Sequence, residues 1–174
     1  MRKGFFMALL LPSLLMCASN LFEESQSVSV PNGCMERIEI KNSYTPSELF
    51  KSSAVCIEEQ KYSQAVELYL VATAYGYFDS ARVVDKSTRN VLDTLKTEIF
   101  GPLDAKKRNQ FAEALRARLD DMKSSCAFLA KLGHPTYYPE YMVQVGVTRG
   151  DGLILNYNAK ALWEDTRVNY LRCP

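Results

Sequence analysis

Residues 45–78 read TPSELFKSSAVCIEEQKYSQAVELYLVATAYGYF, and this segment predicts a pair of antiparallel helices. Thr45 and Glu48 form a capping box around Pro46, which suits the first helical position because proline has no N–H to leave unbonded. Apolar residues then recur at three- and four-residue spacing, as on one buried helical face: Leu49, Phe50, Ala54 and Ile57. A polar turn at 58–61 leads to a second helix over 62–75, so we expect a helical hairpin.

The second helix carries aromatic and small residues in the pattern Tyr62-x2-Ala65-x3-Tyr69-x2-Ala72. This pattern resembles the second helix of a tetratricopeptide repeat, a helix–turn–helix unit of about 34 residues. Leu49 lies where that family prefers a large residue, whereas Ser53 and Cys56 replace its usual small residue and tyrosine. The resemblance covers 45–78 and implies a tetratricopeptide-like helical pair. No second copy of the pattern follows, which argues against a repeat solenoid.

Four further helical segments are expected from apolar periodicity and helix stop signals: 79–100, 104–132, a short one between Pro139 and Gly146, and 158–172. Gly76 is expected to end the helix before them, because glycine adopts the left-handed conformation of a C-terminal cap. Asp79 suits the N-cap of the next helix, and Ser124-Ser125 is a candidate break in the longest one. The fold class that follows is all-α, a bundle of helical hairpins.

Residues 147–157 favour two short extended pieces around a turn at 149–152, which would make a short C-terminal β-hairpin. Residues 20–44 are polar and serine-rich, and their alternating valines and isoleucines fit either short strands or an extended arm. The chain therefore divides into a leader at 1–19, an extended N-terminal arm at 20–44 and a single helical domain at 45–174.

The leader has the layout of a secretory signal peptide. Arg2 and Lys3 precede an apolar run over 5–16, and small residues follow. This run is too short to span a bilayer, which takes about 20 apolar residues. Cleavage after Ser19 predicts a periplasmic protein, or one secreted further. The alternative is a lipoprotein anchored through Cys17, the one form that would meet the membrane, although lipoproteins usually have a small residue before that cysteine.

Four cysteines follow residue 19, and an even number in an exported chain predicts disulfides: Cys34, Cys56, Cys126 and Cys173. Sequence alone leaves three pairings open. We favour Cys34–Cys56, which would staple the arm to the first helix, and Cys126–Cys173, which would pin the C-terminus to the long helix. A zinc site needs close pairs of ligands. No such pair of cysteines is present, so we expect neither a metal nor a cofactor.

Composition and charge exclude further classes. The chain has 174 residues, of which 47% are hydrophobic and 24% charged, and these values suit one globular domain. A net charge of +1 provides no basic excess for binding nucleic acid. His134 is the single histidine, so a histidine-dependent catalytic set must include it. Its position between Gly133 and Pro135 favours packing or the capping of a helix end.

Tyrosines cluster at two places, and tyrosine is enriched at protein interfaces: Tyr137, Tyr138 and Tyr141, and Tyr75 with Tyr77. These rings either cover the core or form a recognition surface for another protein. We expect a non-catalytic protein-interaction module of the bacterial cell envelope, such as an immunity protein that neutralises a secreted toxin or an accessory of a secretion machine. The alternative is a small exported hydrolase that uses Asp or Glu with His134.

Overall fold

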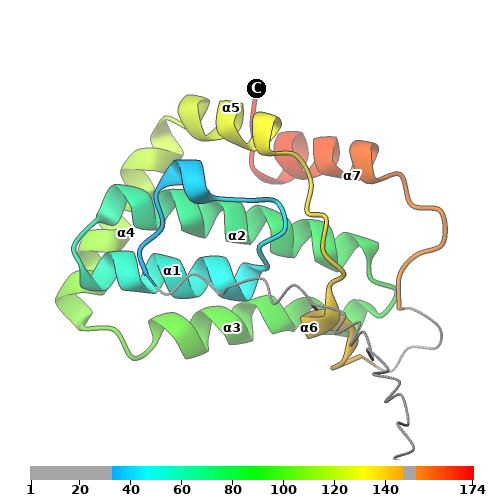
Figure 1. Cartoon of the computed structure of the whole chain (residues 1–174), viewed down its shortest axis with the longest axis horizontal. Coiled ribbons are helices and arrows are strands. Elements are labelled where there is room, and N and C mark those ends of the chain that lie inside the picture. Colours follow the sequence, from blue (N-terminus) through cyan, green and yellow to red (C-terminus); the bar gives the residue numbers. More distant parts are fainter. Residues whose placement is uncertain (1–32, 147–151) are drawn as a thin grey trace, which may run out of the picture.

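The computed structural model describes residues 33–146 and 152–174 (Figure 1). The predicted signal peptide with Cys17, the first part of the arm and most of the predicted turn at 149–152 lie outside these residues. The described part of the chain is helical and contains no strand, which confirms the all-α prediction for it.

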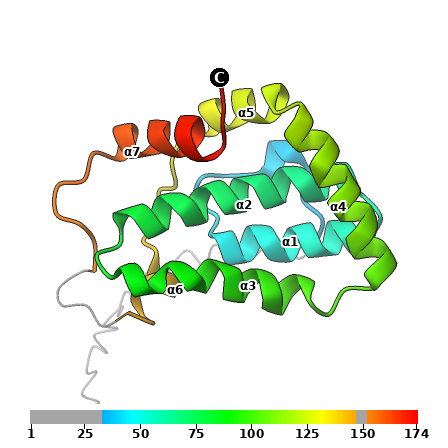
Figure 2. The same cartoon turned by 180° about the vertical axis from the view of Figure 1, so that it is seen from behind.

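Seven α-helices occupy the described residues: α1 (Pro46–Glu58), α2 (Tyr62–Arg82), α3 (Val91–Phe100), α4 (Ala105–Asp120), α5 (Lys123–Leu132), α6 (Glu140–Val143) and α7 (Ala159–Asp165). Helix α2 lies at the centre, with α1 and α3 on one side and α5 and α7 on the other (Figure 1 and Figure 2). Helix α4 crosses one end and joins the two sides. Because α2 is covered on several sides, most of its residues are buried.

The expected hairpin of α1 and α2 is present, and its capping box forms as predicted. The backbone N–H of Thr45 donates to Glu48 Oε2 at 2.7 Å, and the N–H of Glu48 donates to Thr45 Oγ1 at 3.4 Å. Between the two helices, the Ser53 hydroxyl donates to the carbonyl of Ala65 at 2.8 Å. The likeness of this pair to a tetratricopeptide repeat stays a prediction.

The prediction that Gly76 ends the second helix is wrong, because α2 continues through it to Arg82. A Cβ atom at position 76 would overlap the side chain of Leu92 on α3, so the glycine leaves room for Leu92. Asp79, expected as an N-cap, lies inside α2, and the expected helix 79–100 is divided between α2, a 3-10 turn η2 (Lys86–Asn90) and α3.

Lys86 shows why α2 ends at Arg82. Its ammonium group donates to the carbonyl oxygens of Ser80, Ala81 and Val83 at 3.3, 3.1 and 2.6 Å. The last carbonyls of a helix have no partner within the helix, and a cation there also suits the helix dipole. The side chain of Lys86 therefore completes the C-terminus of α2.

The long predicted helix 104–132 is interrupted near the candidate break at Ser124-Ser125. The break falls between α4 and α5, where Asp121 Oδ1 accepts a hydrogen bond from the backbone N–H of Lys123 at 3.2 Å. The final predicted helix 158–172 is present as α7 followed by a π-helical turn, η3 (Thr166–Tyr170).

The two flanking segments pack on α1 and α2 without forming strands. In the arm, a 3-10 turn η1 (Arg37–Glu39) interrupts the extended chain, and Ile40 is buried whereas Ile38 is exposed. Near the C-terminus an isolated bridge pairs Val83 with Leu153. The predicted β-hairpin stays a prediction, because most of its turn lies outside the described residues.

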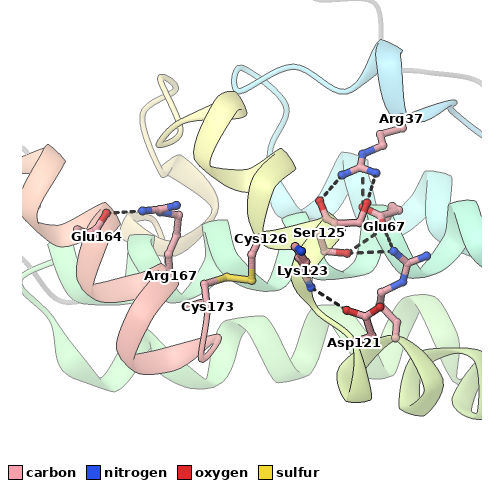
Figure 3. The surroundings of a disulfide bond; sticks show 11 residues. Arg37, Glu67, Asp121, Lys123, Ser125, Cys126, Glu164, Arg167 and Cys173 are labelled. Carbon is pink, nitrogen blue, oxygen red and sulfur yellow. Dashed lines mark hydrogen bonds and ion pairs between the residues drawn. A yellow bond between two sulfur atoms is a disulfide. The ribbon is translucent and has the colours of Figure 1, made fainter.

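Two disulfides tie the N-terminal arm and the C-terminal segment to helices. They are the two pairs that the sequence analysis favoured. Cys34–Cys56 joins the arm to α1, and Cys126–Cys173 joins the C-terminus to α5 (Figure 3). Each bond is worth about 2–4 kcal/mol through the restriction of the unfolded chain. Disulfides form and persist in oxidising compartments, so both agree with an exported protein. None of the helices that the structure describes has the length and apolar content needed to cross a bilayer.

We predict that Gly76→Ala lowers the free energy of unfolding by about 1–3 kcal/mol, the usual cost of overpacking a well-packed contact. Urea denaturation followed by circular dichroism measures this cost. In a Leu92→Ala background the obstructing side chain is gone, so the same change should be neutral or stabilising, because alanine favours helix over glycine by about 1 kcal/mol. An equal cost in both backgrounds would contradict the assigned contact.

Candidate functional site

The predicted surface tyrosine Tyr75 belongs to the core. It is fully buried, its ring centroid lies 5.6 Å from that of Trp163, and its hydroxyl donates to the carbonyl of Gly133 at 3.1 Å. Burial raises the pKa of the Tyr75 phenol well above its ordinary value. The prediction that Tyr75 contributes to an exposed interaction surface is therefore wrong, because Trp163 of α7 and Tyr137 pack over it.

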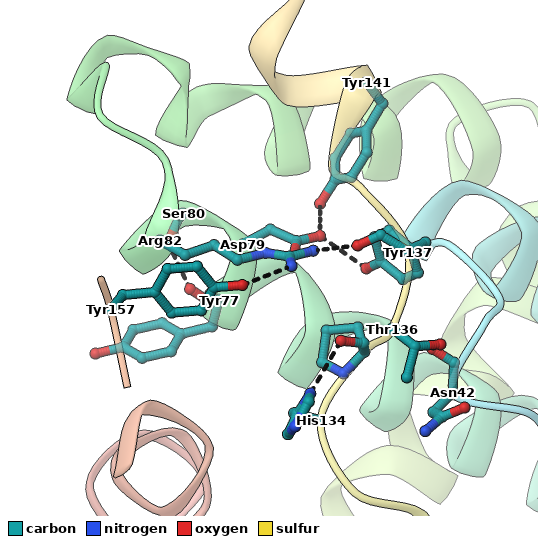
Figure 4. Close-up of polar contacts among 11 residues, drawn as sticks. Asn42, Tyr77, Asp79, Ser80, Arg82, His134, Thr136, Tyr137, Tyr141 and Tyr157 are labelled. Carbon is teal, nitrogen blue, oxygen red and sulfur yellow. Dashed lines mark hydrogen bonds and ion pairs between the residues drawn. The ribbon is translucent and has the colours of Figure 1, made fainter. Parts of the chain in front are cut away.

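The hydroxyls of Tyr137 and Tyr141 point into the protein (Figure 4). Both donate to Oδ2 of Asp79, at 2.7 and 2.8 Å. Oδ1 of Asp79 lies 2.7 Å from Nη2 of Arg82, and the side chains of this ion pair are 0% and 4% exposed. Arg82 also donates to the carbonyl of Tyr137 at 2.8 Å and to the hydroxyl of Tyr157 at 3.3 Å.

This cluster fastens the segment after α5 to the end of α2. Burial raises the pKa of Asp79, while the Arg82 guanidinium and the hydroxyls of Tyr137 and Tyr141 act in the opposite direction. The guanidinium also lies over the rings of Phe78 and Tyr137, at 5.1 and 5.6 Å. The donors of this cluster bond to its own acceptors. We therefore assign it to the stability of the fold and not to the binding of a ligand.

Among the tyrosines predicted at 137–141, Tyr138 is the exposed one. Its side chain is 47% exposed and borders a cavity of about 380 Å³ beside Thr45 and Gln144.

His134 packs against the core. Its ring lies parallel to that of Phe78, with the centroids 5.8 Å apart, and Nδ1 lies 3.1 Å from the carbonyl oxygen of Pro135. No carboxylate in residues 33–146 or 152–174 is within hydrogen-bonding distance of the ring. The end of α5 is capped by Gly133, whose φ is 81° and whose N–H donates to the carbonyl of Leu129, so His134 packs and does not cap.

Tyr77, the remaining predicted tyrosine, borders a groove between α2, α3 and η3. The groove has a volume of about 330 Å³. The rings of Tyr77 and Tyr170 stack at its side, with centroids 4.0 Å apart and an angle of 11° between the planes. We call this site the tyrosine groove and define it by the two stacked rings and three charged residues: Arg89, Asp93 and Lys96.

Two of the three charged residues of the tyrosine groove form an ion pair within the described residues, and the third does not. Asp93 lies in the first turn of α3, where the helix dipole favours an acidic residue, and its Oδ1 is 3.4 Å from Nζ of Lys96. Arg89 is exposed and has no ion-pair partner in the described part of the chain. Burial raises the pKa of Tyr170, and the nearby Asp93 carboxylate raises it further.

Tyr170 separates the tyrosine groove from a second hollow. This one has a volume of about 540 Å³ and lies beside Leu119, Asp121 and Arg172. Tyr170 is 40% exposed and Leu119 is 53% exposed. The amphipathic ring of Tyr170 therefore lies between two depressions, with the exposed side chain of Leu119 at the second.

The C-terminal disulfide positions Tyr170. Cys173 is bonded to Cys126 on α5, and its backbone N–H donates to the carbonyl of Arg167 at 2.9 Å (Figure 3). Helix α5 is in turn held to α2 by Glu67, a buried carboxylate that accepts a hydrogen bond from the Ser125 hydroxyl at 2.9 Å and pairs with Arg118 at 2.8 Å. The exposed ring of Tyr170 therefore lies close to a disulfide that attaches its segment to α5.

The described residues contain no group of three or more His, Cys, Asp or Glu side chains that could hold a metal ion. No protein-family model, curated protein or solved structure matches the chain. The site must therefore be interpreted from its own geometry.

Tyr170 and Arg89 were missed by the sequence analysis. Neither belongs to a cluster of similar residues, and Tyr170 is far from Tyr77 in the chain. The one local signal is the proximity of Tyr170 to Cys173, which indicates that its position is fixed.

We predict that Arg82→Met lowers the free energy of unfolding by about 3–5 kcal/mol, because it leaves the buried Asp79 carboxylate without its cation. Chemical denaturation measures this loss. Adding Asp79→Asn should recover part of it, since the uncompensated charge is then removed. Arg116→Met, at an exposed arginine with no partner in the described residues, is the matched control and should change stability by less than about 0.5 kcal/mol. Equal losses for Arg82→Met and Arg116→Met would contradict the buried pair.

Proposed function

We propose that this protein is an exported, non-catalytic protein-binding module of the bacterial cell envelope, and that it docks its partner on Tyr170 and the tyrosine groove. The observation that carries the proposal is the fixed, exposed ring of Tyr170 between two hollows. Tyrosine and arginine are the residues on which binding energy often concentrates, and such residues lie near the centre of an interface. Tyr77 and Arg89 adjoin Tyr170 in this way.

Rigidity supports the same proposal. A surface that is already ordered before binding loses little conformational entropy when a partner docks. Tyr170 is held by its stack on Tyr77 and by the nearby Cys126–Cys173 bond. An immunity protein for a secreted toxin and an accessory of an envelope machine are the two roles that we consider within this class. The proposal assigns no chemical step to His134, which lacks a carboxylate neighbour in the described residues.

The proposed location is the periplasm, reached through cleavage after Ser19. Lipid attachment at Cys17 would place the same module at a membrane surface, and release from the cell would make it a secreted protein. The two disulfides support all three locations equally, because each is oxidising in comparison with the cytosol.

We predict that the protein isolated from its native cell begins at Asn20 and has no free thiol, because export exposes the four remaining cysteines to oxidation. N-terminal sequencing and labelling of the denatured protein with a thiol reagent test both points. A chain that begins at a lipid-modified Cys17 would select the lipoprotein alternative. Recovery of the intact N-terminus with reduced cysteines would contradict export.

We predict that Tyr170→Ala reduces recovery of the partner by at least about ten-fold, because truncating a central aromatic anchor costs 2 kcal/mol or more. The measurement is cross-linking in intact cells of the native organism, followed by purification and quantitative mass spectrometry. Tyr138→Ala is the matched control, as this tyrosine has a similar exposure but lies at the other predicted surface. Loss of the partner with Tyr138→Ala and not with Tyr170→Ala would move the interface to residues 137–141.

A further inference from the structure

The tyrosine groove has an exposed cation at its edge, in contrast to the buried charged clusters of α2. Glu67 and Asp79 are buried and have their partners within the chain. Arg89, by contrast, is exposed on η2 and has no ion-pair partner in the described residues. Its planar guanidinium presents donors in a fork that matches a carboxylate.

Lys86, the second cation of η2, is close enough to Arg89 to be affected by it, although its ammonium group binds the carbonyls at the end of α2. The pKa of Lys86 is lowered, first by burial and then by the positive charge of Arg89. Two cations of η2 therefore act on each other. The one acidic side chain that lines the groove, Asp93, is already paired with Lys96 at 3.4 Å.

The phenol of Tyr170 can donate a hydrogen bond to a ligand in the groove. Burial raises the pKa of Tyr170, so its phenol keeps its proton at neutral pH. The hydroxyl of Ser80 already donates to the carbonyl of Tyr77 at 2.8 Å, so toward a ligand it can only accept. The donors that a ligand with acceptor oxygens would meet are therefore the guanidinium of Arg89 and the phenol of Tyr170.

The apolar part of the site determines what accompanies the acidic group. The exposed ring of Tyr170 and the exposed side chain of Leu119 offer apolar contact. The depression beside Leu119 is also lined by two acidic and two basic residues: Asp120, Asp121, Lys123 and Arg172. From this charge complementarity we infer that the groove binds an acidic segment of a partner protein, with a carboxylate on Arg89 and an adjacent aromatic or aliphatic side chain on Tyr170. The inference rests on the proposed function and specifies the chemistry of its partner.

The test selects ligands from a displayed library of short random peptides, with the oxidised chain from Asn20 to the C-terminus as the target. We expect the selected peptides to be rich in Asp and Glu next to aromatic or aliphatic residues. Arg89→Glu should weaken the best peptide by at least about ten-fold in fluorescence anisotropy. High salt should weaken it as well, because the charges are exposed and screened.

Arg116→Glu is the matched control, since it makes the same change in net charge at an exposed position outside the groove and should leave the affinity unchanged. Thermal unfolding of both variants confirms that they are folded. Equal weakening by Arg89→Glu and Arg116→Glu would show attraction to net charge alone and would overturn the inference. So would the selection of no peptide.

A selection of neutral or basic peptides would also overturn the inference. If their binding were lost in Tyr170→Ala, the groove would remain a protein-binding site and the proposed function would stand. The cross-linking experiment with Tyr170→Ala decides the proposed function independently of any peptide, so the two failures are distinguishable.

Discussion

Burying a helix on several sides forces its charged side chains to find partners inside the protein, and α2 carries three of them: Glu67, Asp79 and Arg82. An uncompensated buried charge costs several kcal/mol, so the neighbours of α2 are restricted to segments that supply matching groups. Arg118 and Ser125 come from α4 and α5 to Glu67, while Tyr137 and Tyr141 come to Asp79. The charged groups of α2 thereby help to fix α4, α5 and residues 137–141 against it.

The position of the tyrosine groove follows from this arrangement. Near one end of α2, Glu67 binds α4 and α5. Near the other end, Asp79 binds Tyr137 and Tyr141. Between these two, the face that contains Gly76 and Tyr77 is covered by α3 and the C-terminal turn, which leave a gap of about 330 Å³. The groove is therefore a place where the covering of the central helix is incomplete. Its lining comes from residues 76–96 and from Tyr170, which is distant in the sequence.

Local chemistry made part of this structure predictable. The capping box at Thr45 and the spacing of apolar residues lie within a few positions of one another, and the cysteines have few ways to pair. The use of Gly76 and Tyr75 was not predictable, because both depend on neighbours far away in the chain: Leu92 fills the space that a side chain at 76 would need. Likewise, the cluster at 137–141 resembles a recognition surface in sequence, yet two of its hydroxyls bind a carboxylate that a sequence pattern does not place nearby.

The C-terminal disulfide links the proposed location to the proposed site. Tyr170 belongs to a single π-helical turn, and a turn of five residues is marginal without tertiary support. Cys173 supplies that support through Cys126 on α5, which is itself fixed by the buried hydrogen bond of Ser125 to Glu67. In a reducing compartment the turn would keep its ring stack on Tyr77 but lose its covalent attachment. The Cys126–Cys173 bond, which an oxidising compartment allows, therefore adds to the ring stack on Tyr77 in fixing Tyr170.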